Sequence, residues 1–456
     1  MLRRMRIRSL PALALAALLG AAGCKTYPVN RPLAGSTNGE GYYFHNQNRP
    51  ENSGETLLVL AFSGGGTRAA AFSFGVLEAL RDIRITVDGR ERPLLQEVDA
   101  ISSVSGGSVT AAAYGLLGDA TFNVLEEAFL KRNVQGDLAR RVINPFRWPA
   151  LWSSTYGRSD LAADYYDQIL FAGATFADLQ RSRGPFILLN ASDLTTGARF
   201  DFSQYTFDLL CSDLQDYRVS RAVAASSAVP GLLTPITLRN YGGGCGHATP
   251  EWITREYEEA DGRIRLRADE LRTYLNRTNR PYLHLVDGGV SDNLGLRPLL
   301  DIMGVVERNP ALQADLKVGN VKRVVIISAN ARSAPEKDWD RSPKPPNSVV
   351  VAAAAASHTL DRYSMETMEV FRSEFARWQR SMGGSGTIQL YPVMLSFSKF
   401  KDPQRRNFFL NLPTSFFLPK ADVDQLRAAG RELLAADPLF QQLLRDLGAA
   451  TTAAAE

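Results

Sequence analysis

Residues 100–108 read Ala-Ile-Ser-Ser-Val-Ser-Gly-Gly-Ser, and they run from a short apolar strand into a tight glycine turn. Ser105 follows the strand, with the small residue Ser103 two positions before it and Gly107 two positions after it. This spacing approximates the G-x-S-x-G pattern, in which a strained strand-to-helix turn exposes a serine hydroxyl to substrate. Short motifs match by chance, so a serine- and glycine-rich loop is the competing interpretation of this stretch alone.

Two further stretches place glycines directly after an apolar strand. Residues 57–62 form a strand-length apolar run, and Gly64–Gly66 follow it at the start of a helical pattern. Backbone N–H groups at such a helix start are able to hold the negative oxygen of a tetrahedral acyl-transfer intermediate. Residues 282–287 form a third predicted strand, which ends with the carboxylate of Asp287. The turn residue Gly288 follows it.

Taken in chain order, the three motifs resemble the patatin-like phospholipase family over roughly residues 57–293. The resemblance implies an acyl hydrolase that cleaves lipid esters with a Ser–Asp dyad and without a catalytic histidine. By motif position, Ser105 would be the nucleophile and Asp287 its base. The oxyanion donors would be Gly64, Gly65 and Gly66, and the supporting positions would be Arg68, Gly107 and Gly288.

The sequence departs from the family pattern at two positions. Ser63 stands where an acidic residue often precedes the glycines, and Ser103 stands in place of a glycine. Neither departure removes a reacting group. We expect Arg68 to support the glycine turn, with contact to a lipid phosphate or a surface ion pair as the alternatives.

Two other enzymatic interpretations use the same residues differently. Gly64-x-Gly66-x-x-Ala69 after a strand also fits the loose dinucleotide-binding pattern, with Asp88 as the ribose acid, but this assigns no role to the other two turns. A Ser–Asp–His triad would need His358 or His284 as its base.

Local patterns argue against these triad residues. His358 lies in a helical pattern, and alternation along the strand places His284 on the face opposite Asp287. Asp193, a rival acid at the end of the predicted strand 186–191, lacks a glycine turn. A non-catalytic envelope scaffold that binds lipid or a partner is the remaining alternative.

The N-terminus has the pattern of a secretory signal, which we assign to residues 1–23. Four arginines within residues 3–8 precede the apolar run 12–19, which is shorter than the ~20 residues that span a bilayer. Residues 21–24 resemble a bacterial lipoprotein box and imply lipidation of Cys24, and Lys25 resembles the residue of lipoproteins sorted to the outer membrane. We therefore expect an exported lipoprotein that faces the periplasm, with ordinary cleavage and a free Cys24 thiol as the alternative.

Charge and cysteine usage narrow the function further. The formal net charge of +4 includes the four signal arginines, so the mature chain is close to neutral and nucleic-acid binding is not expected.

In an oxidising compartment, the remaining Cys211 and Cys245 predict one disulfide, with two free buried thiols as the alternative. The histidines show no metal-ligand spacing with the cysteines, so we expect no metal site, and the implied reaction requires no cofactor. The sequence makes no prediction of oligomeric state.

Strands alternate with helical patterns along most of the chain. This predicts one α/β domain over residues 55–450, with a mainly parallel sheet covered by helices on both faces in three layers, as in patatin-like folds. Sites in such sheets lie at the carboxyl ends of the strands.

We interpret residues 24–54 as a tether and residues 250–280 as a polar surface insertion. We expect the aromatic and proline-rich stretch 144–152 to pack on the core, with contact to lipid or a cover over the pocket as alternatives.

Overall fold

The computed structural model describes residues 30–449 except 48, 50–51, 88, 256–261, 307–320 and 383–387. The predicted signal peptide, Cys24 and Asp88 lie outside the described residues. Within the described part of the chain, no helix is long and apolar enough to cross a membrane.

The centre of the molecule is an eight-stranded sheet, with seven strands in the order β12-β11-β2-β5-β6-β10-β9 and β7 paired to β6. The neighbours from β12 to β6 are parallel, and β10, β9 and β7 pair antiparallel. The strands are β2 (Thr56–Phe62), β5 (Val98–Val104), β6 (Phe186–Asp193), β7 (Arg199–Asp201), β9 (Ile236–Arg239), β10 (Tyr282–Asp287), β11 (Arg323–Asn330) and β12 (Gln389–Ser396). The parallel strands are buried and apolar, as expected for a sheet covered on both faces.

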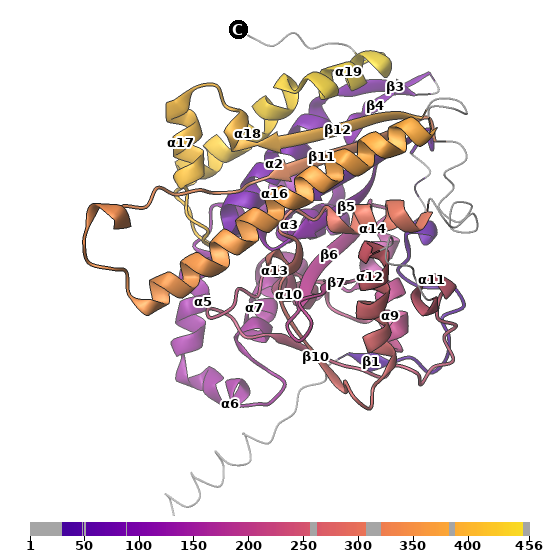
Figure 1. Cartoon of the computed structure of the whole chain (residues 1–456), viewed down its shortest axis with the longest axis vertical. Helices are drawn as coiled ribbons and strands as arrows, with labels where there is room; N and C mark the ends of the chain where they lie inside the picture. The colour runs from indigo at the N-terminus through magenta and orange to yellow at the C-terminus, as the bar shows by residue number, and fades with distance from the viewer. Residues whose placement is uncertain are drawn as a thin grey trace, which may run out of the picture.

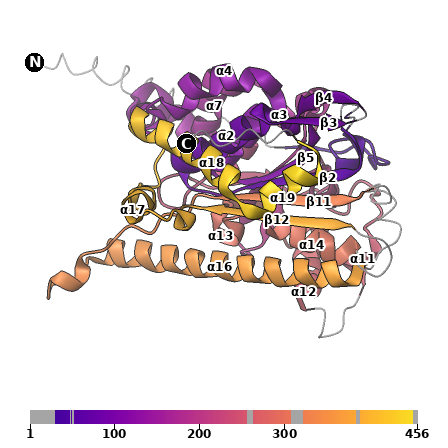
Figure 2. The same ribbon diagram turned by 90° about the horizontal axis from the view of Figure 1, so that it is seen from above.

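Helices cover both faces of this sheet, so the predicted three-layer α/β fold is confirmed (Figure 1). Figure 2 shows the sheet edge-on between the two helical layers. The larger core contains residues of α2 (Gly66–Asp82), α3 (Gly106–Leu117), α10 (Val219–Ser226) and α18 (Lys420–Ala436). The smaller core lies under α14 (Arg297–Val306) and the long helix α16 (Ser348–Met382).

The remaining α-helices lie around these layers. They are α4 (Thr121–Leu125), α5 (Val134–Ile143), α6 (Trp148–Leu151), α7 (Arg158–Tyr166), α8 (Phe176–Arg181), α9 (Gln204–Leu209), α11 (Glu251–Thr254), α12 (Gly262–Arg272), α13 (Gly289–Asp292), α17 (Pro403–Asn411) and α19 (Pro438–Asp446). Short strand pairs join β1 (Arg31–Pro32) to β8 (Ser212–Asp213) and β3 (Arg84–Val87) to β4 (Arg90–Pro93).

The strand that carries Asp287 runs against the direction that a simple parallel sheet implies. β10 is antiparallel to β6, and only Leu285, Val286 and Asp287 pair with it, opposite residues 191–193. The strand therefore enters from beyond the carboxyl end of β6 and ends level with Ala191. Asp287 still reaches the carboxyl edge of the parallel strands, because β10 overlaps β6 only at that edge.

Part of the predicted tether is instead packed on the domain. β1 pairs with β8, and the ring of Tyr42 is fully buried against Phe176 and Phe186, with its hydroxyl accepting a hydrogen bond from the Ile187 N–H at 2.8 Å. This segment has no periodicity because a two-residue strand and single aromatic anchors, and no long regular element, attach it.

The predicted surface insertion at 250–280 contains more buried side chains than its polar sequence suggests. α12 buries Arg267, which forms an ion pair with Asp201 at 3.2 Å, and η8 (Thr273–Leu275) buries Tyr274. A disulfide joins Cys211 to Cys245, with 5.5 Å between their Cα atoms. It attaches the glycine-rich loop ahead of this insertion to the end of α9.

Candidate active site

Ser105 occupies the turn between β5 and α3. Its backbone has φ 50° and ψ −119°, a conformation that a residue with a Cβ rarely adopts outside constrained turns. The turn is tight because Gly106 and Gly107 have no side chains: a Cβ on Gly106 would lie 1.9 Å from the Gly66 carbonyl oxygen, and one on Gly107 would lie 2.7 Å from that of Ser63. The close approach brings the glycine loop, Gly64–Gly66, and the Ser105 turn together.

Asp287 meets Ser105 at this turn. The Ser105 hydroxyl donates a hydrogen bond to Asp287 Oδ2 at 2.9 Å, and the Gly289 N–H donates to Asp287 Oδ1 at 2.8 Å. The Asp287 backbone is fixed as well, since its N–H donates to the Ala228 carbonyl at 3.0 Å and its carbonyl accepts from Ser192 Oγ at 2.9 Å. Gly288 allows this placement, because a Cβ there would lie 2.3 Å from the Asn190 carbonyl oxygen.

Burial changes the chemistry of this carboxylate. Ser105 is 4% exposed and Asp287 is 8% exposed. Loss of hydration raises the pKa of Asp287 to about 6, although the hydrogen bonds from Gly289 and Ser105 act in the opposite direction. A carboxylate whose pKa is closer to neutrality is a stronger base toward a serine hydroxyl than an exposed aspartate.

A group of hydroxyl side chains behind the turn was not predicted from the sequence. Ser226 Oγ accepts a hydrogen bond from the Ser105 N–H at 2.9 Å and donates to the Asn190 carbonyl at 2.6 Å. Ser108 Oγ lies 2.9 Å from Ser226 Oγ and donates to Ser103 Oγ at 3.2 Å. In the sequence, Ser226 is marked only by its place in the run 220–228, most of whose residues are small. Its contacts with the turn can therefore be recognised only in the tertiary structure.

The glycine loop does not present all of its N–H groups. The Gly64 N–H donates to the Asn293 carbonyl at 2.9 Å, so its predicted role as an oxyanion donor is wrong in this structure. The N–H groups of Gly65, Gly66 and Gly106 have no acceptor among the described residues. Gly65 and Gly66 have φ of 140° and 60°, and glycine adopts such values without the strain that a side chain imposes.

Arg68 lies beneath the glycine loop and supports it. Its guanidinium donates to the carbonyls of Ala331 and Leu412 at 2.8 and 2.7 Å and to Thr414 Oγ1 at 3.0 Å. The side chain is buried, and burial lowers its pKa to about 10. Arg68 therefore fixes the loop to segments near the end of the chain and does not face a lipid phosphate.

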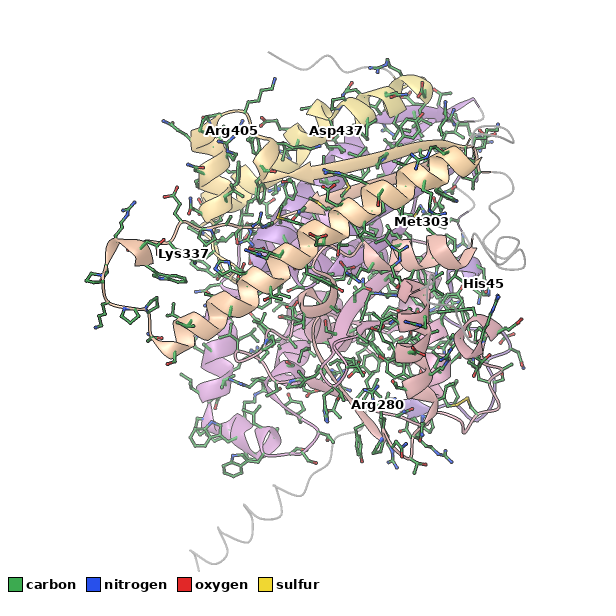
Figure 3. The ribbon with its side chains drawn as sticks, in the orientation of Figure 1. His45, Arg280, Met303, Lys337, Arg405 and Asp437 are labelled. Carbon is green, nitrogen blue, oxygen red and sulfur yellow. A yellow bond between two sulfur atoms is a disulfide. The ribbon has the colours of Figure 1, made fainter. Side chains whose placement is uncertain are left out.

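The rival residues lie in other surroundings. Asp193 forms an ion pair with Arg280 at 2.5 Å, and Figure 3 shows Arg280 near the lower edge of the molecule. His284 Nδ1 lies 3.0 Å from Thr237 Oγ1 on the exposed face of β10, and His358 is exposed on α16. Within the described part of the chain, the Ser105 hydroxyl forms its hydrogen bond with Asp287 and with none of these side chains, and no described group of His, Cys, Asp and Glu is arranged to hold a metal ion.

The solved structures that match this chain share little sequence with it. Human GIVD cytosolic phospholipase A2 is 13% identical, with a TM-score of 0.47, and the match covers 87% of this chain and 62% of the human chain. VipD from Legionella pneumophila is 13% identical, with a TM-score of 0.26, and the match covers 89% of this chain and 72% of VipD. This chain thus spans less than two thirds of the human protein, and no curated protein sequence matches it.

A family model gives the decisive comparison. The model of the patatin-like phospholipases matches residues 60–300, which is more than half of the 456 residues. The matched region includes the glycine loop, the Ser105 turn and the Asp287 turn. The mostly parallel α/β fold places these three motifs together at one edge of its sheet. The chain therefore belongs to the patatin-like phospholipase family of serine hydrolases.

Proposed function

We propose that this chain is an exported acyl hydrolase of the phospholipase A or lysophospholipase type, which cleaves lipid esters through the Ser105–Asp287 dyad. The observation that carries this proposal is the 2.9 Å hydrogen bond between Ser105 Oγ and Asp287 Oδ2 on a strained turn. The buried carboxylate has a raised pKa, and its protonation state is suited to accept the serine proton near neutral pH.

In the proposed reaction, Ser105 Oγ attacks the ester carbonyl while its proton passes to Asp287. The tetrahedral oxyanion accepts hydrogen bonds from the N–H groups of Gly65 and Gly66, and each donor of this kind contributes about 3 kcal/mol in comparable sites. Asp287 then returns the proton to the departing alcohol, which leaves an acyl group on Ser105. Water attacks this acyl-enzyme with Asp287 as base, and the products are a free fatty acid and the original serine.

The direct test is to label the purified protein with a fluorophosphonate and to assay a phospholipid panel by mass spectrometry. The wild-type protein should be labelled at Ser105 and should release fatty acid, whereas Ser105→Ala should do neither. Folded wild-type protein that resists labelling and hydrolyses no lipid would favour the alternative of a lipid-binding scaffold.

We further propose that Cys24 carries the lipid that anchors the enzyme to the outer membrane on its periplasmic side. The disulfide between Cys211 and Cys245 supports an oxidising compartment, since such bonds are rare in the bacterial cytosol. Radiolabelled palmitate should enter the wild-type protein and be lost in Cys24→Ala. Unlabelled wild-type protein in the soluble fraction would contradict the anchor without affecting the proposed hydrolysis.

A further inference from the structure

The stretch 144–152 leaves large apolar side chains in solvent, contrary to the expectation that it packs on the core, and Ile143 just ahead of it is exposed as well. Phe146 is 91% exposed and Ile143 is 71% exposed, and Trp148 and Trp152 are also exposed. Side chains of this segment project from α6 at the lower left of Figure 3. Burial of such side chains in a protein core would be favourable, so their exposure indicates a surface with another use.

A neighbouring loop extends this apolar surface. Thr234 lines the same hollow as Trp148 and Trp152, and Arg158 donates a hydrogen bond to the Gly231 carbonyl at 3.4 Å. Leu232, between these two contacts, is 72% exposed. We call residues 143–152 together with Leu232 the aromatic surface.

The segment that carries the aromatic surface contains only basic charges. Residues 138–159 contain four arginines and no aspartate or glutamate. Arg140 forms an ion pair with Asp137, but no carboxylate among the described residues forms an ion pair with Arg147 or Arg158. Exposed tryptophan and phenylalanine with unpaired arginines are the composition that binds the interface of an anionic bilayer.

The aromatic surface is connected to the dyad by a short loop. At one end of residues 228–234, the Ala228 carbonyl accepts a hydrogen bond from the Asp287 N–H at 3.0 Å. At the other end, Thr234 accepts from Ser159 at the start of α7. The dyad itself is buried, so a lipid must enter from outside, and a bilayer that contacts the aromatic surface would lie within one short loop of Asp287.

The chain also enters the domain at this end of the molecule. β1 and α6 both lie toward the lower end of Figure 1, and Asn30, the first described residue, is only six residues after Cys24. Six extended residues span about 20 Å at most, so a lipid at Cys24 would keep this end close to the membrane.

From these observations we propose that the aromatic surface docks on an anionic phospholipid bilayer and delivers the membrane's own lipids to Ser105. The partner is the bilayer surface, because a membrane alone offers both an apolar layer for the aromatic rings and anionic head groups for Arg147 and Arg158. This inference rests on the proposed function for its purpose, but the docking itself is independent of the dyad.

The test measures contact between the tryptophans and acyl chains without catalysis. The full chain carrying Ser105→Ala is mixed with phosphatidylcholine vesicles that contain brominated acyl chains, with and without phosphatidylglycerol. We expect at least a twofold larger quenching of tryptophan fluorescence in the vesicles that contain phosphatidylglycerol. Trp148→Phe with Trp152→Phe should remove most of this quenching, whereas the matched control Trp339→Phe should leave it unchanged.

The contribution of charge is tested in the same vesicles. Arg147→Ala with Arg158→Ala should reduce the quenching to its value in phosphatidylcholine alone. The control Arg84→Ala with Arg90→Ala removes two exposed arginines from the β3–β4 pair and should have no effect. Equal effects of both pairs would indicate general attraction to anionic lipid and would overturn a localised docking surface. Protein that sediments with vesicles without quenching at Trp148 and Trp152 would overturn it too.

A second readout uses the active chain. Phe146→Ser with Trp152→Ser should lower hydrolysis of vesicle phospholipid about tenfold and leave hydrolysis of a soluble short-chain ester unchanged. Leu266→Ser, which alters an exposed leucine on α12, is the matched control and should change neither rate. Loss of both rates in the double variant would indicate damage to the fold, and unchanged vesicle hydrolysis would contradict docking. If the wild type hydrolyses neither substrate, the proposed function fails, while the fluorescence result still decides the docking.

Discussion

Asp287 combines two requirements that oppose each other in a single side chain. It must be ionised to accept a proton, yet burial raises its pKa to about 6 because the charged form loses hydration. The protein therefore places a carboxylate where its charge is costly, and the hydrogen bonds from Gly289 and Ser105 offset only part of this cost.

The raised pKa predicts how activity depends on pH. Since the ionised form is the base, kcat/KM should increase as pH rises and should level off above about 6, not above the ordinary aspartate value of about 3.9. Asp287→Asn should lower kcat/KM at least about 100-fold, because a positioned general base contributes at least that factor. A rate profile that is flat between pH 4 and 7 in the folded enzyme would contradict this role.

The same shift predicts how stability depends on pH. A carboxylate whose pKa is raised in the folded state destabilises the protein above that pKa, and the penalty disappears as pH falls toward the unfolded value. At pH 8 the Asp287→Asn variant should therefore gain up to about 3 kcal/mol in free energy of unfolding from removal of the charge. Urea titrations of both proteins at several pH values should show this advantage shrinking between pH 6 and 4.

Gly106 tests the contact between the serine turn and the glycine loop. Its added Cβ would lie 1.9 Å from the Gly66 carbonyl, and a backbone atom has little room to move away. Gly106→Ala should therefore separate the two motifs and reduce ester turnover about 100-fold or more, as misplacement of catalytic groups by about 1 Å does. Gly35→Ala, where no atom lies within 4 Å, is the control and should leave the rate unchanged.

At the scale of elements, local sequence patterns predicted the position of the strands better than their pairing. The apolar run expected at 282–287 forms β10 with those bounds, and the apolar run that leads to Ser105 forms β5. The antiparallel direction of β10 depends on partners far along the chain, so no local pattern contains it. Gly64 shows the same limit, because only the folded chain brings the Asn293 carbonyl to its N–H.

The errors at 30–47 and 144–152 have a related cause. Both segments lack periodicity, and periodicity is the signal that separates core elements from loops. Tyr42 is buried by contacts with Phe186 of β6, while Phe146 and Trp152 remain exposed. Hydrophobicity alone does not distinguish these outcomes.

A helix from the last part of the chain, α18, supports the glycine loop through its packing on α2. α18 crosses α2 at very short distance, since a Cβ on Gly75 would lie 2.1 Å from the Arg427 carbonyl and one on Gly430 would lie 2.5 Å from that of Phe72. Arg427 and Arg431 also form ion pairs with Glu78 of α2, at 2.6 and 2.7 Å. α18 thus holds the helix whose first residue is Gly66.

This crossing predicts a large effect of one methyl group. Gly75→Ala should force the helices apart and lower the free energy of unfolding by about 2 to 3 kcal/mol, as overpacking does in other cores. Gly304→Ala is a suitable control in α14, because its Cβ would meet only the flexible side chain of Ile264 at 3.3 Å. Thermal unfolding of both variants measures the difference, and equal midpoints would contradict the close packing.

At the scale of the whole molecule, residues beyond the family match complete the fold. β11 lies between β2 and β12, so the strand before the glycine loop pairs with a segment more than 250 residues later. Arg68 donates to Ala331 and Leu412 in the same distant region. The active-site edge is therefore assembled from both ends of the described chain.

The disulfide gives a prediction at this scale. Cys211 and Cys245 are separated by 34 residues, and closing a loop of that length stabilises a folded domain by about 4 kcal/mol in the chain-entropy model. Cys245→Ser should therefore lower the melting temperature by several degrees under oxidising conditions. Dithiothreitol should lower the wild-type melting temperature toward that of the variant and leave the variant unchanged, and a wild-type protein insensitive to the reductant would contradict the bond.

The short overlap between β10 and β6 fixes the position of Asp287, and it leaves the length of the loop ahead of β10 free to vary. Three residue pairs with β6, the pairing of residues 282–285 with β9 and the bond to Ala228 hold Asp287 at its level in the sheet, while residues 277–279 ahead of the strand are exposed. A peptide tag or a small domain inserted at residues 277–279, ahead of Arg280 and its ion pair with Asp193, would thus lengthen the approach to the strand without moving the carboxylate. This turn is a natural grafting site for engineering the enzyme.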